Sequence, residues 1–204
     1  MKHSIKNLIL SGCTMLLMAS CGINKQVEQL KAFEKCRYDL LSADSLSIAS
    51  VPISDLVDKN GFNFTKTPRL ALAFLRKDVP FAAKLNLKVT NPSADLAAIN
   101  QFEYKILFKN HELAQGLVDQ QIAVQPAGGE TTVPIKINSN VYELLSDTKT
   151  AQDIADFFAA GKSGKEKKGI MTIKIKPTIG LGGKKITYPG YITIDKEVSS
   201  KILL

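Results

Sequence analysis

The sequence is poor in the residues that carry most catalysis and metal binding. It has 2 histidines, 3 cysteines and no tryptophan in 204 residues. Zinc motifs such as His-Glu-x-x-His and paired Cys-x-x-Cys are absent. It also lacks an aromatic stacking motif and a recognised nucleic-acid motif, so no nucleic-acid partner is expected. We therefore expect no metal, no cofactor and no catalytic centre, and an enzyme of unrecognised type is the least favoured class.

Long apolar runs are confined to the N-terminus. Residues 8–18 are largely apolar, follow Lys2 and Lys6, and lead into Ala19-Ser20-Cys21. A basic segment, a short apolar core and small residues before a cleavage point predict a secretory signal, and this core is too short to span a bilayer comfortably. We expect residues 1–20 to be removed and the mature protein to lie outside the cytoplasm.

The end of this signal, Met18-Ala19-Ser20-Cys21, resembles the bacterial lipobox. In that motif the cysteine becomes the first residue, and its thiol carries a diacylglyceryl group. Two or three acyl chains anchor a protein stably, because each buried methylene contributes about 0.8 kcal/mol. The alternative is an ordinary secreted protein with Cys21 near the cut. Gly22 follows the cysteine where enterobacterial retention signals have Asp, so the resemblance implies the outer membrane, facing the periplasm.

Cysteine use also limits how the mature domain is held together. Cys13 is lost with the signal and Cys21 would be lipidated, which leaves Cys36 without a disulfide partner. Cys36 alternates with charged residues on the same face as Tyr38, so a buried structural thiol is favoured over a reactive or intermolecular one. Residues 21–32 are expected to form a polar tether or a frayed helical turn, and residues 33–204 one domain held by its core.

The charge is positive and concentrated in one segment. Removal of the signal leaves 25 basic against 19 acidic residues, a net charge of +6. That balance suits an anionic envelope surface but identifies no partner. The glycine-bounded segment 161–169 is predicted to be a mobile loop, and it holds Lys162, Lys165, Lys167 and Lys168. Solvation is the default explanation of these lysines, and contact with anionic headgroups or cell-wall polymer is the alternative.

Strand patterns dominate from residue 33 onward. The clearest lies at 81–90, where alternate residues from Phe81 to Val89 are apolar. Further strands are expected at residues 36–40, 46–53, 102–108, 118–124, 131–137, 170–176 and 186–194. Helices are expected at 67–79, starting at Thr67-Pro68, and at 150–160, capped by residues 150–153. This pattern predicts a mainly β fold, an antiparallel two-sheet β-sandwich with one or two inserted helices.

Three spaced segments at the centre of the chain resemble the water-stress and hypersensitive-response (WHy) domain, also called the late embryogenesis abundant type 2 family. They are residues 87–92 (Leu-Lys-Val-Thr-Asn-Pro), 104–116, and 124–135 with Pro126-Ala127-Gly128-Gly129. The last has one residue more than usual before Thr131. The resemblance is strong over about a quarter of the chain. It implies an immunoglobulin- or fibronectin-like sandwich with a helix between late strands, and none of its motifs is catalytic.

The remaining candidates for chemistry have simpler structural explanations. His111 is expected in a solvent-facing turn, and the glycine-rich segment 180–185 is expected to be a hairpin turn because it lies between two strands and lacks a phosphate-loop ending. Two carboxylate pairs are expected to be helix-start or loop charges. They are Asp55 with Asp58, and Asp153 with Asp156.

The sequence therefore predicts a non-enzymatic envelope lipoprotein, anchored in the membrane through Cys21, with a binding or stabilising WHy-like module. The resemblance implies a stress-related role. The ligand is expected to be apolar, since sandwiches of this family can open between their sheets, or to be another envelope protein. The alternative is an accessory subunit of a larger cell-envelope complex, docking through the helix at Leu70–Phe74 or through a sheet edge.

Overall fold

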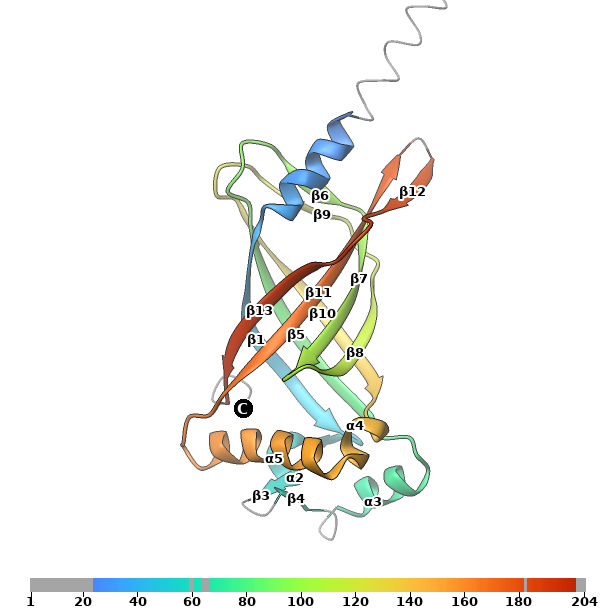
Figure 1. The fold of residues 1–204 in the computed structure, drawn as a ribbon, viewed down its shortest axis with the longest axis vertical. Helices are drawn as coiled ribbons and strands as arrows, with labels where there is room; N and C mark the ends of the chain where they lie inside the picture. The colour runs from blue at the N-terminus through green and yellow to red at the C-terminus, as the bar shows by residue number, and fades with distance from the viewer. Residues whose placement is uncertain (1–23, 59–60, 64–66, 182, 201–204) are drawn as a thin grey trace, which may run out of the picture.

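Two antiparallel β-sheets form the body of the molecule (Figure 1). The computed structural model describes residues 24–58, 61–63, 67–181 and 183–200. The predicted signal peptide and Cys21 lie outside these residues. The predicted fold class is confirmed: the chain is mainly β, with antiparallel strands and a few helices. Among the described residues, no helix is both long and apolar enough to cross a membrane.

The first sheet has the strand order β10-β5-β1-β2. Its strands are β1 (Arg37–Ile48), β2 (Val51–Pro52), β5 (Pro80–Thr90) and β10 (Glu130–Asn140). The predicted facing of β5 is confirmed, because Phe81, Leu85 and Leu87 are buried while Lys84 is exposed. The strand expected at 46–53 is wrong as one element: residues 46–48 end β1, which also contains residues 37–40 of the strand expected at 36–40 and bulges twice along β5. Ala49 and Ser50 turn the chain with positive φ angles before β2, and Ile53 already begins a helix.

The second sheet has the order β12-β11-β7-β8, with β13 also paired to β11. Its strands are β7 (Gln101–Phe108), β8 (His111–Val118), β11 (Lys168–Leu181), β12 (Lys184–Thr187) and β13 (Ile192–Ser199). The strand predicted at 186–194 is wrong as one element: it is split into β12 and β13 around Pro189-Gly190, which disfavour a continuous ladder. The predicted hairpin at 180–185 is confirmed, with Leu181 opposite Lys184.

Two short strand pairs complete the β-structure. One pairs β3 (Val57–Asp58) with β4 (Gly61–Phe62), and the other pairs β6 (Ala97–Ile99) with β9 (Ile122–Val124). The strand predicted at 118–124 is therefore two: its first residue ends β8, and its last three form β9. His111, expected in a turn, is instead the first residue of β8 opposite Phe108, because Lys109 and Asn110 take the turn with positive φ angles of 48° and 69°.

The two sheets are joined by side chains along both edges. On the side where β8 meets β10, the Ser139 hydroxyl donates to the Leu113 carbonyl at 2.8 Å, and the Tyr104 hydroxyl donates to the Lys136 carbonyl at 2.9 Å. Gly116 permits the Tyr104 bond, since a Cβ there would lie 2.6 Å from the Tyr104 oxygen. Between β13 and β1, Lys196 Nζ lies 2.7 Å from Asp39 Oδ1. These contacts close the sandwich along its sides.

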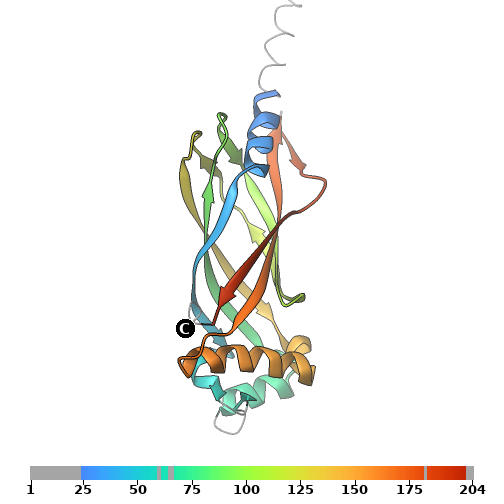
Figure 2. The same cartoon turned by 60° about the vertical axis from the view of Figure 1, so that its left-hand side comes forward.

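Helices lie at both ends of the sandwich (Figures 1 and 2). A helix over residues 24–34 stands at one end, so the described part of the predicted tether is helical, and its Ala32 is buried. The opposite end, called the helical end here, carries the other four. They are α2 (Ile53–Leu56), α3 (Pro68–Leu75), α4 (Tyr142–Ser146) and α5 (Thr148–Lys162).

The ends of the predicted helices move by several residues. The helix expected at 67–79 stops at Leu75, and Thr67 occupies its N-cap position without a side-chain capping bond. The helix expected at 150–160 begins at Thr148 and ends at Lys162, and its cap is Asp147, whose carboxylate accepts from the Thr150 N–H at 2.8 Å. The cap predicted at residues 150–153 is wrong, because the carboxylate of Asp147 already accepts from the Thr150 backbone N–H and the helix starts before Thr150.

The predicted mobile loop at 161–169 is shorter and more constrained than expected. It contains only residues 163–167, because α5 runs to Lys162 and β11 starts at Lys168. Lys167 is tied to the C-terminal strand segment: its N–H donates to the Ser200 hydroxyl at 3.0 Å, and its carbonyl accepts from the Ser200 N–H at 2.9 Å. Backbone pairing of this kind holds the loop beside the end of β13.

Candidate functional site

A small cavity of about 50 Å³ lies between the two sheets near the helical end. Its walls come from both sheets and from α2, α4 and α5. Each lining side chain is apolar, and they are Ala43, Leu46, Ile48, Ile53, Phe81, Ala83, Leu85, Ile106, Phe108, Leu113, Ile137, Val141, Leu144, Leu145, Ile154, Phe158 and Met171. We call this space the sandwich cavity.

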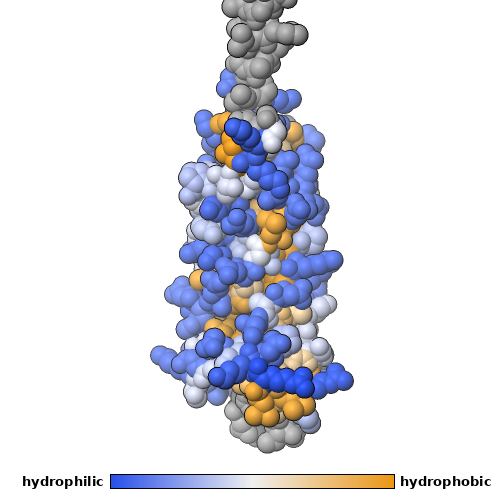
Figure 3. All heavy atoms as spheres, turned by 90° about the vertical axis from the view of Figure 1, so that its right-hand side faces the viewer, coloured by the Kyte–Doolittle hydropathy of each residue, from blue (hydrophilic) through white to orange (hydrophobic). Residues whose placement is uncertain are grey.

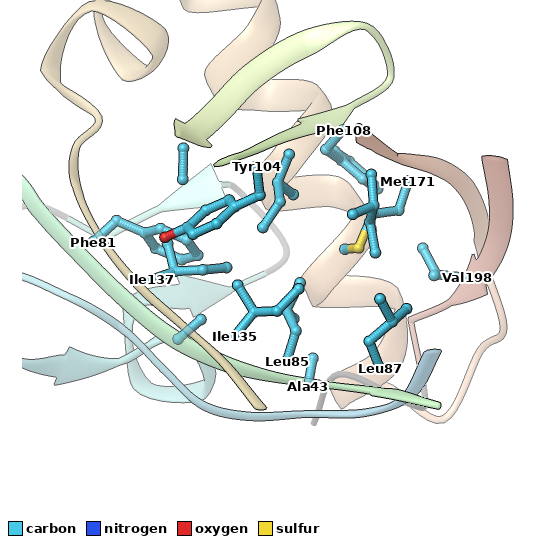
Figure 4. Packing of buried hydrophobic residues seen from close by; sticks show 14 of the residues in the cluster. Ala43, Phe81, Leu85, Leu87, Tyr104, Phe108, Ile135, Ile137, Met171 and Val198 are labelled. Atoms are coloured by element: carbon cyan, nitrogen blue, oxygen red, sulfur yellow. The ribbon is translucent and has the colours of Figure 1, made fainter. Parts of the chain in front are cut away.

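Strand alternation explains which side chains face the cavity. On β5, Phe81, Ala83 and Leu85 are two residues apart and therefore share the inner face. Figure 4 shows Phe81 from the first sheet beside Tyr104 from the second, and Leu85 from the first sheet facing Met171 from the second. Ala43 on β1 lies opposite Leu85, and Ala83 lies opposite Ile137 on β10. These small side chains leave the central space unfilled between larger neighbours.

The helical end of the cavity is covered by α4 and α5. Ile154 and Phe158 are four residues apart, so they lie on the same face of α5 and both reach the cavity. Phe157 contributes an aromatic cluster behind them: its ring centroid lies 4.8 Å from that of Phe108 and 5.5 Å from that of Phe158, in edge-to-face geometry. The cover is thus held to β7 by contacts between rings rather than by a backbone ladder.

The sandwich cavity contains no ionisable side chain, so its only means of recognition are shape and apolar contact. A cavity lined in this way stays dry, because a water molecule inside it would find no hydrogen-bond partner. The arrangement suits an aliphatic chain or a methyl-rich group. It offers neither a nucleophile nor a base to a reacting molecule.

The buried Cys36 lies at the other end of the molecule, near the helix over residues 24–34. Its Sγ donates to the Ala32 carbonyl at 3.4 Å, and burial raises the pKa of the thiol to about 11. A thiol with that pKa is almost entirely protonated at neutral pH and is a poor nucleophile. The prediction of a buried structural cysteine is confirmed.

The structure places the four predicted surface lysines together at the helical end but gives three of them partners. Lys162 Nζ donates to the Ser54 carbonyl at 2.7 Å, Lys167 Nζ lies 3.8 Å from Asp156, and Lys168 Nζ lies 2.7 Å from Glu197. Lys165 is exposed. Contact of this cluster with an anionic surface stays a prediction.

The members of the two carboxylate pairs have different surroundings, and neither pair forms a site with His111 in the part of the chain that the structure describes. Asp55 is exposed on α2, whereas Asp58 lies on β3 and accepts from Asn63 Nδ2 at 3.0 Å. Asp153 and Asp156 on α5 face different lysines, Lys109 and Lys167. Among the residues that the structure describes, no group of three or more His, Cys, Asp or Glu side chains could hold a metal ion.

Sequence reasoning found the inner faces of the strands, and the family resemblance implied that the sheets can open, but neither the position of the cavity nor all of its cover was predicted. The helix α4, with Leu144 and Leu145, was not predicted, and its five residues are too few for a clear periodic signal. The small side chains at Ala43 and Ala83 were the available signal, because two alanines on inner faces of neighbouring strands leave space that a large partner must fill.

Comparison with known proteins gives distant structural likeness alone. No family profile matches the chain, and no curated protein matches it. A crystal structure of an Archaeoglobus fulgidus protein is similar with a TM-score of 0.37 and 16% identity, covering 79% of this chain and 95% of that chain.

Two solution structures are also similar. A putative late embryogenesis abundant protein has a TM-score of 0.31 and 12% identity, covering 96% of this chain and 83% of its own. A protein from Arabidopsis thaliana has a TM-score of 0.30 and 19% identity, covering 60% of this chain and 69% of its own. The chain is thus distantly similar in structure to one putative late embryogenesis abundant protein.

Proposed function

We propose that this protein is an exported, lipid-anchored binding protein that holds an apolar ligand between its two sheets. The observation that carries the proposal is the wholly apolar lining of the sandwich cavity. The chain would act without catalysis, because the side chains around the cavity offer only packing contacts. Lipidation of Cys21 would keep the domain at the envelope, where apolar molecules with acyl chains are abundant.

The size of the cavity sets how a ligand would enter. An empty cavity costs about 24 cal/mol per Å³, so a space of about 50 Å³ costs the fold about 1 kcal/mol. A ligand that filled it would recover this amount. A longer aliphatic chain would also have to push back Ile154 and Phe158 on α5, which pack by side chains alone and can move without breaking a sheet.

The test fills the sandwich cavity with a larger side chain of the protein itself. Ala83→Val adds two carbons inside the cavity in a side chain that suits a strand, and Ala123→Val makes the same change at an exposed position on β9. We expect the wild-type protein, purified from envelopes, to carry an apolar molecule detected by solvent extraction and mass spectrometry. It should also bind an apolar fluorescent probe.

The two variants should then separate. Ala83→Val is expected to weaken probe binding by about ten-fold, because the added methyl groups occupy space that the probe would fill, and a ten-fold change in affinity corresponds to about 1.4 kcal/mol. The melting temperature should stay unchanged or rise, because the same methyl groups fill an empty space in the core. Ala123→Val should bind like the wild type. Absence of both extracted ligand and probe binding in the wild type, or equal affinity in all three proteins, would refute the proposal.

A further inference from the structure

One element of the helical end, α3, exposes two large apolar side chains. Leu75 is 81% exposed and Leu72 is 52% exposed, whereas Leu70 and Ala73 on the same helix are buried. Figure 3 shows a hydrophobic patch over α3 beside strongly hydrophilic side chains, at the end opposite the N-terminal helix. That the helix at Leu70–Phe74 docks a protein partner stays a prediction; Leu70 itself faces the core, so the exposed face of this helix is formed by Leu72 and Leu75.

Helical spacing explains the protrusion. Leu72 and Leu75 are three residues apart and therefore neighbours on one side of α3, while Leu70 and Ala73 form the opposite, buried side. Thr67 and Val79, which flank the helix, are also buried. The helix is thus anchored by its inner side and its two ends, and it presents its leucines on a fixed support.

Basic side chains surround these leucines. Arg69, Arg76 and Lys77 are exposed, and none of them forms an ion pair within the described part of the chain. The single acidic residue among residues 67–80 is Asp78. Three unpaired cations beside two protruding leucines make a surface that is both apolar and positive. We call these five residues, Arg69, Leu72, Leu75, Arg76 and Lys77, the α3 tip.

We propose that the α3 tip docks onto an anionic lipid bilayer, with the leucines entering the headgroup boundary and the basic side chains meeting lipid phosphates. Apolar side chains flanked by Lys and Arg bind such surfaces through the sum of burial and electrostatic attraction. A protein partner is less well matched. Two leucines on a convex helix without a tyrosine or tryptophan fall short of the area and the aromatic anchors of a stable protein interface.

The position of the α3 tip gives this docking a direction. It lies at the end opposite residues 24–34, and β11 alone, with 14 residues at about 3.3 Å each, extends about 45 Å between those ends. A chain anchored near its N-terminus would therefore reach away from its own membrane and meet a second surface. The docking itself rests only on the α3 tip, and is independent of both the anchor and the sandwich cavity.

The test places a reporter at the proposed depth of insertion. The mature chain from residue 21 carries Leu75→Cys together with Cys21→Ser, so that it has no acyl group and the label cannot react at position 21. It is labelled with an environment-sensitive fluorophore and mixed with vesicles of phosphatidylcholine and phosphatidylglycerol in equal parts, or of phosphatidylcholine alone. Leu117→Cys is the matched control, because Leu117 on β8 is 52% exposed, like Leu72, and lies outside the tip. We expect a blue shift at position 75 with anionic vesicles, its suppression by salt, and no shift at position 117.

A second arm separates charge from apolar contact. In the labelled protein, Arg69→Gln, Arg76→Gln and Lys77→Gln together should weaken the response to anionic vesicles by about 100-fold, or about five-fold per cation. These side chains are exposed, so the melting temperature should hold. The proposal is overturned if position 75 gives no shift, if position 117 shifts equally, or if the triple variant binds as before. A shift that needs an envelope protein and fails with lipid alone would overturn it in favour of a protein partner.

Discussion

Asn91 is a polar side chain with no exposed surface, and it holds one end of the sandwich together. Its Nδ2 donates to the Asp95 carbonyl at 2.8 Å and to the Val124 carbonyl at 3.1 Å, while its Oδ1 accepts from the Ser93 N–H at 3.0 Å. The backbone of the same residue pairs with Gly128 and Gly129. The Asn91-Pro92 motif therefore has a structural task, and the Asn91 side chain satisfies three separate backbone groups.

Asn91→Asp tests this task without changing the size of the side chain. A carboxylate cannot donate, so the Asp95 and Val124 carbonyls would lose their partner and a charge would be buried. We expect the free energy of unfolding to fall by about 2–4 kcal/mol, measured by chemical denaturation.

Asn138→Asp is the matched control, because it makes the same chemical change at an exposed position on β10. A new charge that stays in water should change the stability little. If Asn91→Asp were as stable as the Asn138→Asp variant, the hydrogen bonds at position 91 would carry no net weight in the fold.

At the scale of elements, α5 depends on a single capping residue. Asp147 is the one residue between α4 and α5, and hydrogen bonds from the Thr150 side chain and backbone lower the pKa of its carboxyl. Because α5 covers the sandwich cavity, the state of this cap also bears on the proposed ligand site.

Asp147→Ala should loosen the first turn of α5 while the sheets stay intact. Hydrogen exchange is expected to rise in the amides of residues 148–151, with β5 and β11 unchanged. Asp147→Asn is the control, because asparagine caps helices nearly as well, and it should restore protection. Equal exchange in all three proteins would show that packing alone holds the helix start.

The same cap gives a direction for pH dependence. The pKa of Asp147 is lower in the folded protein than in the unfolded chain, so its contribution is complete above the ordinary aspartate pKa of about 3.9 and is lost as the pH falls through the lowered value. Protection of the first α5 turn should therefore decline on acidification in the wild type. In Asp147→Asn it should not, since the amide does not titrate.

A comparison of predicted and observed elements shows which features of the fold the sequence alone can predict. Alternation identified the inner face of β5 correctly, because burial on one side of a strand leaves a period of two in the residues themselves. The predicted ends of α3 and α5 differ from the observed ends by several residues. Several residues near each end could cap the helix, and tertiary contacts determine which of them does so. The resemblance implied that the sheets can open, but the position and volume of the sandwich cavity were not predicted, because they depend on how Ala43 and Ala83 lie against residues of the other sheet.

At the scale of the whole molecule, the anchor and the helical end would lie far apart. The described chain begins at one end of the sandwich with residues 24–34, and the predicted lipid site, Cys21, is three residues earlier in sequence. Anchoring, envelope location and the outer membrane remain predictions from residues 1–22. The cavity, the four lysines and the α3 tip all belong to the opposite end.

Cys21→Ser would decide the anchoring. Without the thiol there is no site for the diacylglyceryl group, so we expect an uncleaved or soluble precursor in place of a membrane-bound protein. Mass spectrometry of the mature N-terminus checks the modification directly. Cys36→Ser, which alters the buried thiol and leaves the proposed anchor intact, should still fractionate with membranes. An unmodified residue at position 21 in the wild type would contradict the anchor.

The connections of α5 bear on how fast a ligand could leave. On one side Asp147 alone joins it to α4, and on the other residues 163–167 join it to β11, a segment that reaches at most about 17 Å when extended. The hydrogen bonds between Lys167 and Ser200 shorten the free part of this connecting segment further. The cover can therefore tilt but cannot swing clear of the sandwich. A molecule held beneath it would leave by slow diffusion through a narrow gap, and its residence time would be set by tilting of α5 more than by its own affinity.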